Sequence, residues 1–222
     1  MKRNLLLVFL IAVFGVGCST QSGSPSEFPL EKGTTWVYSF ETYEPSEPSP
    51  SQIVEATYRL TATVAETEIK PPYFLAHVIF KYELVSSDSG WRGLWVNDRP
   101  TETWYILDNH QIFESANIDI NTIDNKPGTL DYVFPLSDQK RWCHMQNPPC
   151  LSVGWRAVIN QGVYETPAGK FDECYDMQDF YNGGSRFHTF CIGVGIVAMS
   201  YDHVGTPFGY QQTLTEYVVG VP

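Results

Sequence analysis

Alternating apolar and polar residues predict β-strands along most of the chain. The stretch IVEATYRLTATVAETEI, residues 53–69, has a period of two, which is typical of a strand with one buried face. The residues expected on the buried face are Val54, Ala56, Tyr58, Leu60, Ala62 and Val64. The next stretch, YFLAHVIFKYELV at residues 73–85, is apolar on both faces, which predicts a central strand.

Turn signals divide the strands into hairpins. Pro71-Pro72 separates the first two strands, Asn109-His110 lies within TETWYILDNHQIFES, and Pro167-Ala168-Gly169 precedes the strand that contains Cys174. The last predicted strand is QQTLTEYVV, residues 211–219, and no long segment has a helical period. Short strands joined by turns predict a single all-β domain, either an antiparallel β-sandwich or a strongly curved sheet (half-barrel).

The stretch CYDMQDFYNGGSRFHTFC predicts a hairpin closed by two cysteines. Asn182-Gly183 favours a two-residue turn, because both central residues of a type I′ turn need positive φ. Cys174 then opposes Cys191 in a non-hydrogen-bonded pair, where side chains lie closest. Other cross-strand pairs in this register are Asp179–Arg186, Tyr175–Phe190 and Met177–His188. We expect a Cys174–Cys191 disulfide, which contributes about 3 kcal/mol for a loop of this length.

Two further cysteines, Cys143 and Cys150, lie in RWCHMQNPPC. Of the three pairings that four cysteines allow, the hairpin register selects Cys174–Cys191 together with Cys143–Cys150. A metal site formed by Cys143, His144 and Cys150 is the alternative for this segment. Paired cysteines are typical of an exported protein in an oxidising compartment.

The N-terminal segment, MKRNLLLVFLIAVFGVGCST, begins with two basic residues and continues with a short apolar run and small residues. This arrangement is typical of a secretory signal, because the run is too short to span a bilayer comfortably. The end of the segment resembles the bacterial lipoprotein signal, which implies cleavage before Cys18 and acylation of Cys18. Cleavage by an ordinary signal peptidase is the alternative. The expected divisions are residues 1–17 as signal peptide, 18–27 as lipidated N-terminus and flexible tether, and 28–222 as the β-rich domain.

Charge narrows the range of partners. The chain has 14 basic and 25 acidic residues, a net charge of −11, and removal of the signal would leave 12 basic and 25 acidic residues, or −13. An acidic protein repels phosphate backbones, so we expect no nucleic-acid partner. The predicted membrane contact is the lipid anchor at Cys18. Ser19 follows it where lipoproteins retained in the inner membrane carry aspartate, which leaves the outer membrane or cell surface as the expected location.

A short motif occurs twice: Phe28-Pro29-Leu30 precedes Trp36 by the same spacing as Phe134-Pro135-Leu136 precedes Trp142. We interpret it as the start of a strand with a buried tryptophan, with remote internal duplication as the alternative. Together with TPAGKFDEC, CIGVGIVAMS and the final LTEY, these segments resemble a group of bacterial lipoproteins of unassigned activity. The shared pattern, FPLxxGxxWxY, PAGxFxxC and GVGxV, implies a fold and a compartment but no reaction.

Candidate catalytic and metal-binding residues are few. There is no Gly-x-Ser-x-Gly nucleophile elbow, and Gly193-Val194-Gly195 lies in a strand pattern, where small residues allow a bulky side chain to approach the backbone. Asp202-His203 is the one acid–histidine neighbour pair. The segment NIDINTIDN has calcium-like alternation, but Thr122 and Gly128 stand where a calcium loop needs glycine and glutamate. We therefore expect no catalytic residue, cofactor or metal.

Aromatic residues are abundant, with 6 Trp, 13 Tyr and 13 Phe. They are typical of a β core, and they are also typical of an aromatic-lined cavity within a curved sheet. The leading hypothesis is a membrane-anchored extracytoplasmic lipoprotein with a binding or structural role, whose partner is a protein, a glycan or an apolar ligand. The alternatives are a carrier or sensor of an apolar ligand in a curved-sheet cavity, and an envelope hydrolase that uses Asp202 and His203.

Overall fold

The computed structural model describes most of the chain after the N-terminal segment. The described residues are 27–47, 49, 51–97, 99–116, 118, 128–144, 150, 154–181 and 184–220. The strands are β1 (Thr35–Pro45), β2 (Ile53–Lys70), β3 (Tyr73–Ser87), β4 (Glu102–Asp108), β5 (Gln111–Ser115), β6 (Thr129–Val133), β7 (Arg141–Cys143), β8 (Trp155–Thr166), β9 (Gly169–Tyr181), β10 (Gly184–Cys191), β11 (Gly195–His203) and β12 (Gly209–Val218). One short helix, α1 (Leu94–Asn97), lies between β3 and β4.

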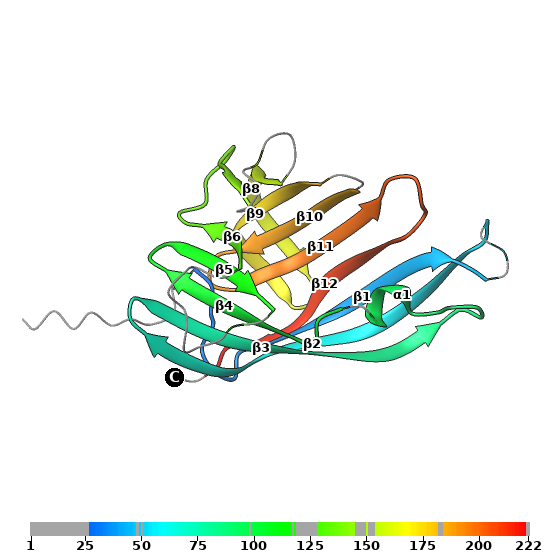
Figure 1. Ribbon diagram of the computed structural model, residues 1–222, viewed down its shortest axis with the longest axis horizontal. Helices are drawn as coiled ribbons and strands as arrows, with labels where there is room; N and C mark the ends of the chain where they lie inside the picture. Colours follow the sequence, from blue (N-terminus) through cyan, green and yellow to red (C-terminus); the bar gives the residue numbers. More distant parts are fainter. Residues whose placement is uncertain are drawn as a thin grey trace, which may run out of the picture.

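All twelve strands belong to one antiparallel sheet, in the order β6-β5-β4-β3-β2-β1-β12-β11-β10-β9-β8-β7. Figure 1 shows the sheet curving back over itself, so that the long strands β1–β3 form one side and β8–β11 cross above them. The all-β prediction is confirmed, and the strongly curved single sheet is the alternative that the chain adopts. Because the sheet curves, one face of nearly every strand points into a shared interior.

The alternation predicted for residues 53–69 is present in β2. The six residues expected on the buried face, Val54, Ala56, Tyr58, Leu60, Ala62 and Val64, are all buried. The register of β2 places this face opposite Trp36, Tyr38 and Phe40 of β1, since Ala62 pairs with Trp36 and Leu60 with Tyr38. The period of two in the sequence therefore identifies the face that lines the interior.

The prediction that residues 73–85 form a central strand is correct for only half of their length. Residues Phe74–Ile79 pair with β4 on one side and β2 on the other. Beyond Ile79, β3 pairs with β2 alone, and Leu84 and Val85 are exposed. Apolar residues on both faces do not distinguish a strand between two neighbours from one that extends past the end of a shorter neighbour.

The hairpin between β9 and β10 has the predicted register. Cys174 pairs with Cys191, Asp179 with Arg186, and Met177 with His188. The Cys174–Cys191 and Cys143–Cys150 disulfides are both present. Asn182 and Gly183, the predicted turn, lie outside the described residues.

The other predicted hairpins are also present. Asp108 pairs with Gln111 around Asn109-His110, and Asn109 has a φ of 55°. Lys70 pairs with Tyr73 around the two prolines, and Thr166 pairs with Gly169. The turn signals therefore located the reversals of the chain correctly.

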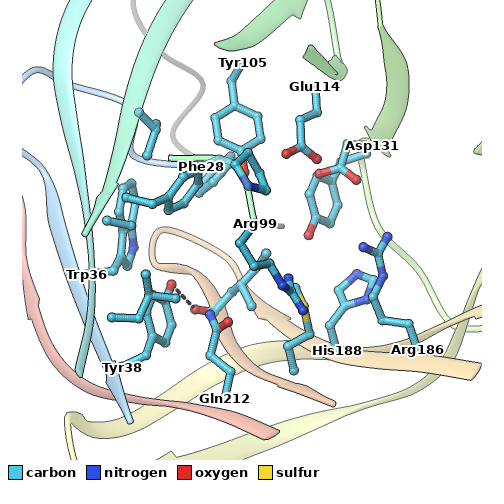
Figure 2. A pocket seen from close by; sticks show the side chains of 18 of the residues that line it. Phe28, Trp36, Tyr38, Arg99, Tyr105, Glu114, Asp131, Arg186, His188 and Gln212 are labelled. Carbon is cyan, nitrogen blue, oxygen red and sulfur yellow. Dashed lines mark hydrogen bonds between the residues drawn. The ribbon is translucent and has the colours of Figure 1, made fainter. Parts of the chain in front are cut away.

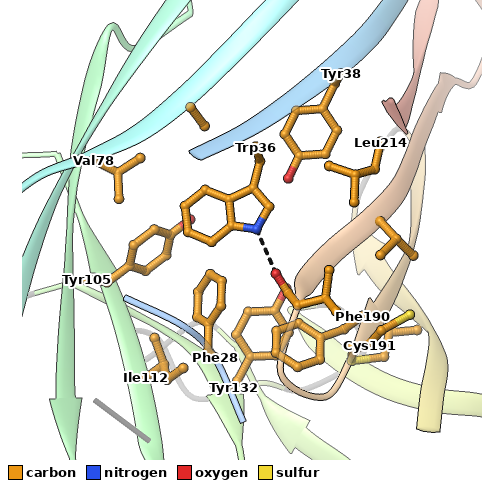
Figure 3. Close-up of a cluster of buried hydrophobic side chains, with 14 of the residues drawn as sticks. Phe28, Trp36, Tyr38, Val78, Tyr105, Ile112, Tyr132, Phe190, Cys191 and Leu214 are labelled. Carbon is orange, nitrogen blue, oxygen red and sulfur yellow. Dashed lines mark hydrogen bonds between the residues drawn. The ribbon is translucent and has the colours of Figure 1, made fainter. Parts of the chain in front are cut away.

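A cluster of aromatic side chains forms the centre of the core (Figure 3). The ring of Phe28 packs against four others, those of Trp36, Tyr105, Tyr132 and Phe190. Trp142, the tryptophan of the second motif copy, is buried as Trp36 is, and each is the second residue of its strand. The interpretation of the motif as the start of a strand with a buried tryptophan is confirmed.

Gly193-Val194-Gly195 lets this cluster approach the backbone. The indole Nε1 of Trp36 donates to the Val194 carbonyl at 2.6 Å, the bond drawn in Figure 3. A Cβ added at Gly195 would lie 2.5 Å from a ring carbon of Phe28, and Gly195 has a φ of +97°. Gly195 therefore needs glycine for the close approach of a bulky side chain, as the sequence predicted, but residues 192–194 form the turn between β10 and β11 and not part of a strand.

Candidate functional site

The interior of the curved sheet contains a cavity of about 140 Å³. It has two unlike ends, and Figure 2 shows aromatic side chains on one side and charged side chains on the other. The apolar end includes Phe28, Trp36, Tyr38, Leu60, Val78 and Tyr105. The polar end consists of Glu114, Asp131, Tyr132, Arg156, Arg186 and His188.

The polar end rests on a group of four charged residues, Asp131, Arg156, Asp179 and Arg186, which we call the ion network. Arg156 of β8 donates through Nε and Nη2 to the two carboxylate oxygens of Asp179 at 2.5 and 2.9 Å. Its Nη1 donates to the carboxylate of Asp131 at 2.5 Å and to the carbonyl of the same residue at 2.6 Å. The Nε of Arg186 donates to Asp179 at 2.6 Å.

Three residues of the ion network are buried, Arg186 is partly exposed, and the charges of the network balance. Arg156 is 1% exposed and Asp179 is fully buried. Burial by itself raises the pKa of Asp179, but the guanidinium groups of Arg156 and Arg186 outweigh it and hold the pKa well below its usual range. Asp179 therefore stays charged between Arg156 and Arg186, and the hydrogen bonds of the network offset part of the cost of desolvating its charges.

Beside the ion network lie three groups with incomplete hydrogen bonding, Glu114, Tyr132 and His188, which we call the polar cluster. The hydroxyl of Tyr132 and both ring nitrogens of His188 are buried and have no hydrogen-bond partner among the described residues. Glu114, which is partly exposed, accepts a hydrogen bond from Thr103 Oγ1 at 3.3 Å. Native proteins pair almost all buried polar atoms, so unpaired atoms that line a cavity need an explanation.

Local strand geometry directs these three side chains inward. Glu114 lies two residues after the buried Ile112 of β5 and pairs with Tyr105 of β4, so it shares the interior face of the strand. His188 of β10 pairs with the buried Met177, and its ring meets that of Tyr132 edge-on with centroids 6.0 Å apart. Strands β5 and β6 at one edge of the sheet and β10 in its other half thus bring the polar cluster together.

The environment of the polar cluster changes its ionisation. Burial and then the neighbouring Asp131 raise the pKa of Glu114 to about 7. Burial and the charge of Arg156 hold the pKa of His188 well below its usual value, so its imidazole is neutral near pH 7. The polar cluster can therefore present a carboxylate, a hydroxyl and a neutral imidazole to a molecule in the cavity.

The connection between β3 and β4, residues 88–101, covers one side of the cavity. Glu44, which is fully buried, accepts the backbone N–H groups of Arg92 at 2.7 Å and Leu94 at 3.1 Å, and so anchors the connection to β1. The guanidinium of Arg99 lies over the ring of Tyr210, 4.2 Å from its centroid. Arg99 lines the cavity through this contact with aromatic rings.

A second pocket, of about 420 Å³, lies among β8 to β12. It shares His188, Met199 and Gln212 with the first cavity. Its one carboxylate, Asp176, accepts hydrogen bonds from Thr189 at 2.7 Å and Asn160 at 3.1 Å. Because its acidic group has partners, this pocket is the weaker candidate for a binding site.

The structure does not arrange Asp202 and His203 as a catalytic pair. Neighbouring residues of a strand point to opposite faces, and both lie in β11. The carboxylate of Asp202 accepts a hydrogen bond from the Tyr43 hydroxyl, and the His203 ring stacks on Phe208. His203 Nδ1 is buried without a partner in the described part of the chain, so Asp202 does not orient it.

The metal alternative for Cys143, His144 and Cys150 is wrong, because the two sulfur atoms are joined as a disulfide. His144 Nδ1 lies 3.0 Å from the Leu130 carbonyl. Within the described ranges, no group of three or more His, Cys, Asp or Glu side chains could hold a metal ion. The calcium-like residues Asn117, Asp119, Asn121 and Asp124, and the predicted lipidation site Cys18, lie outside the described residues.

The sequence offered an aromatic-lined cavity as one alternative and placed Asp179, Arg186 and His188 in strands, but it did not predict the polar end of the cavity. It missed Glu114, Asp131 and Arg156 altogether. A signal was present, because Arg156 lies two residues before the buried Val158, and Glu114 lies two residues after the buried Ile112. A charged residue in phase with the apolar face of a strand indicates a buried charge that needs a partner.

Comparisons with known proteins found no matching family model and no matching curated protein. One similar solved structure is a Bacteroides fragilis protein described as exported and as having a YmcC-like fold, with 13% identity, 86% of this chain and 98% of that chain covered, and a TM-score of 0.45. Another, from Parabacteroides distasonis, is described as a lipoprotein, with 14% identity, coverage of 86% and 97%, and a TM-score of 0.39. Because both TM-scores are low, these proteins provide no basis for assigning a function to this chain.

Proposed function

We propose that this chain is a lipid-anchored protein on the extracytoplasmic side of a bacterial cell envelope, at the outer membrane or cell surface. The signal-like N-terminus with Cys18, the small polar tether and the two disulfides support the proposal. The segments FPLEKGTTWVY, TPAGKFDEC and CIGVGIVAMS support membership of the lipoprotein group that they resemble. No helix in the described residues is long and apolar enough to cross a bilayer.

Fractionation of cells that express the full chain tests the anchor. We expect the protein in the membrane fraction, with an acyl increment on Cys18 in its intact mass. The Cys18→Ala variant should lack the increment and lose stable membrane attachment. A wild-type protein of unmodified mass in the soluble fraction would contradict the anchor.

The role of the domain is to bind a small ligand inside the curved sheet. The observation that carries this proposal is the cavity of about 140 Å³, with an aromatic end and a polar end whose Tyr132 and His188 atoms have no hydrogen-bond partner among the residues that the structure describes. An apolar cavity of about 150 Å³ holds a benzene-sized molecule. The ligand is therefore a small molecule, or the end of a longer one, with an apolar group and a hydrogen-bonding head.

Toluene, titrated in ligand-observed NMR experiments, tests the cavity alone. We expect it to bind the wild type and to lose binding to Ala62→Met, because Ala62 lines the cavity and the larger side chain fills it. The matched control is Ala157→Met, since Ala157 follows Arg156 in β8 and faces the opposite side of the sheet. Equal binding of toluene to Ala62→Met and wild type, or no binding to either, would contradict the proposal.

A further inference from the structure

The carboxylates at the polar end of the cavity differ in how they are paired. In the ion network, Arg156 lies 2.5 Å from Asp131 and 2.5 Å from Asp179. Arg186 lies 2.5 Å from the second oxygen of Asp179. Glu114 forms no ion pair among the residues that the structure describes. Its nearest hydrogen-bond donor is the neutral hydroxyl of Thr103, at 3.3 Å.

The other two members of the polar cluster, Tyr132 and His188, can accept hydrogen bonds. The Tyr132 hydroxyl oxygen has free lone pairs, and a neutral imidazole such as that of His188 has one unprotonated nitrogen. A primary ammonium has three N–H donors, which matches a carboxylate, a hydroxyl oxygen and an imidazole nitrogen. The adjoining aromatic rings, among them Tyr105 and Trp36, favour a cation over their faces.

An anionic ligand fits this site less well. The guanidinium groups of Arg156 and Arg186 already contact Asp131 and Asp179, and that of Arg99 lies on the Tyr210 ring. A ligand carboxylate at the polar end would add negative charge beside Glu114 and Asp131, which is unfavourable in a medium of low dielectric constant. The net charge of the whole chain, −11, also attracts cations and repels anions.

We infer that the cavity binds a small organic ammonium ion, with Glu114 as its counter-ion and its apolar group against the aromatic end. The inference rests on the proposed ligand-binding function and adds the charge of the ligand. Glu114 supplies the charge, Tyr132 and His188 accept hydrogen bonds from the ammonium, and the aromatic rings enclose the apolar group. The cavity volume, about 140 Å³, limits that group to about one ring.

Isothermal titration of the full, disulfide-intact chain with three matched probes tests the inference. Benzylammonium, benzyl alcohol and benzoate share one ring and differ in the charge of the head group. We expect benzylammonium to bind at least about tenfold more tightly than benzyl alcohol, and benzoate to bind weakest. If benzyl alcohol or benzoate binds as tightly as benzylammonium, the inference fails and the ligand-binding function stands. If none of the three binds, both fail.

The variant Glu114→Gln identifies the counter-ion. We expect it to weaken benzylammonium binding at least about tenfold and to leave the affinity for benzyl alcohol nearly unchanged. The matched control is Glu165→Gln, an exposed glutamate of β8, which should bind all three probes as the wild type does. Unchanged benzylammonium binding in Glu114→Gln would overturn the role of Glu114.

The pH dependence of the wild type gives a second measurement that needs no variant. The groups that face Glu114 are Asp131, Arg186, Arg156 and Thr103. Glu114 takes up a proton as the pH falls below about 7. The affinity for benzylammonium should therefore fall from pH 8 to pH 6, and that for benzyl alcohol should stay nearly constant. Equal pH profiles for the two probes would contradict the inference.

Discussion

The ion network and the polar cluster lie side by side at one end of the same cavity, but they use their hydrogen bonds differently. Arg156 is paired on two sides by Asp131 and Asp179. Tyr132 and His188 bury polar atoms without partners in the described part of the chain. Buried polar groups whose hydrogen bonds are complete are compatible with a stable fold. A buried polar atom without a hydrogen-bond partner costs desolvation free energy, which a bound ligand could offset. The difference separates residues whose hydrogen bonds are complete from residues that the proposed ligand would contact.

The largest expected effect follows removal of the central arginine. The Arg156→Met variant removes the arginine that pairs with the buried Asp131 and one of the two arginines that pair with Asp179, so we expect a loss of about 3–5 kcal/mol in the free energy of unfolding. Urea denaturation measures it. The control is Arg59→Met, which breaks an exposed pair with Glu216 and should cost less than about 1 kcal/mol. Equal losses in the two variants would show that the ion network is not structural.

The hairpin of β9 and β10 carries residues of both groups, and its disulfide should contribute the next largest effect. Replacing Cys174 and Cys191 together by serine should lower the free energy of unfolding by about 3 kcal/mol, because the unfolded chain gains freedom. The Cys143–Cys150 bridge has a sequence separation of 7 rather than 17, so its loss should cost slightly less. Urea denaturation of both double variants checks the order.

Acid–base behaviour should distinguish the two groups by sign. The pKa of Asp179 is lowered in the folded protein. Its contribution to the free energy of unfolding is therefore present above the pKa of the unfolded chain and is lost as the pH falls toward the folded pKa. The pKa of Glu114 is raised from 4.5 to about 7. Its contribution to the free energy of unfolding is therefore fully present below pH 4.5 and is lost as the pH rises through 7.

The Glu114→Gln variant isolates that second contribution. It should be more stable than wild type at pH 8 by on the order of 1–2 kcal/mol, allowing for solvent screening, and the gain should shrink toward pH 4.5. Thermal denaturation across this range measures the difference. A gain that does not change with pH would mean that Glu114 does not titrate in the folded protein.

The smallest effect compares two buried tyrosines. The Tyr38 hydroxyl donates to the Ile196 carbonyl at 3.0 Å, so Tyr38→Phe should lose about 1 kcal/mol. The Tyr132 hydroxyl has no partner in the described residues, so Tyr132→Phe should be neutral or slightly stabilising. Chemical denaturation of the two variants checks this. A similar loss in both would show that the Tyr132 hydroxyl has a partner in the free protein.

The sequence predicted local features of the fold well. Alternation in residues 53–69 identified the buried face of β2, and Asn182-Gly183 fixed a register that the strands on either side follow from Tyr181–Gly184 to Cys174–Cys191. These predictions succeeded because strand period and turn geometry depend on neighbouring residues. The choice between a sandwich and a curved sheet stayed open in the sequence, since it depends on which distant strands pair.

The site was harder to predict for the same reason. The partners of Arg156 lie 25 residues before it and 23 residues after it. His188 lines the same cavity as Glu114 and Tyr132 because the sheet curves and brings β10 over β5 and β6. The alternation of apolar and polar residues indicates that a strand position is buried. It does not indicate which charged residue from a distant strand lies opposite that position. The apolar character of β3 was misleading for a related reason, because β4 is shorter than β3 and leaves its end exposed.

The most direct measurement is a crystal structure of the protein with benzylammonium. We expect the ring among Phe28, Trp36 and Tyr105, and the nitrogen within hydrogen-bond distance of Glu114, with Tyr132 or His188 as a second acceptor. An empty cavity at saturating benzylammonium, or a nitrogen that points away from Glu114, would contradict the claim that the polar cluster is completed by a ligand.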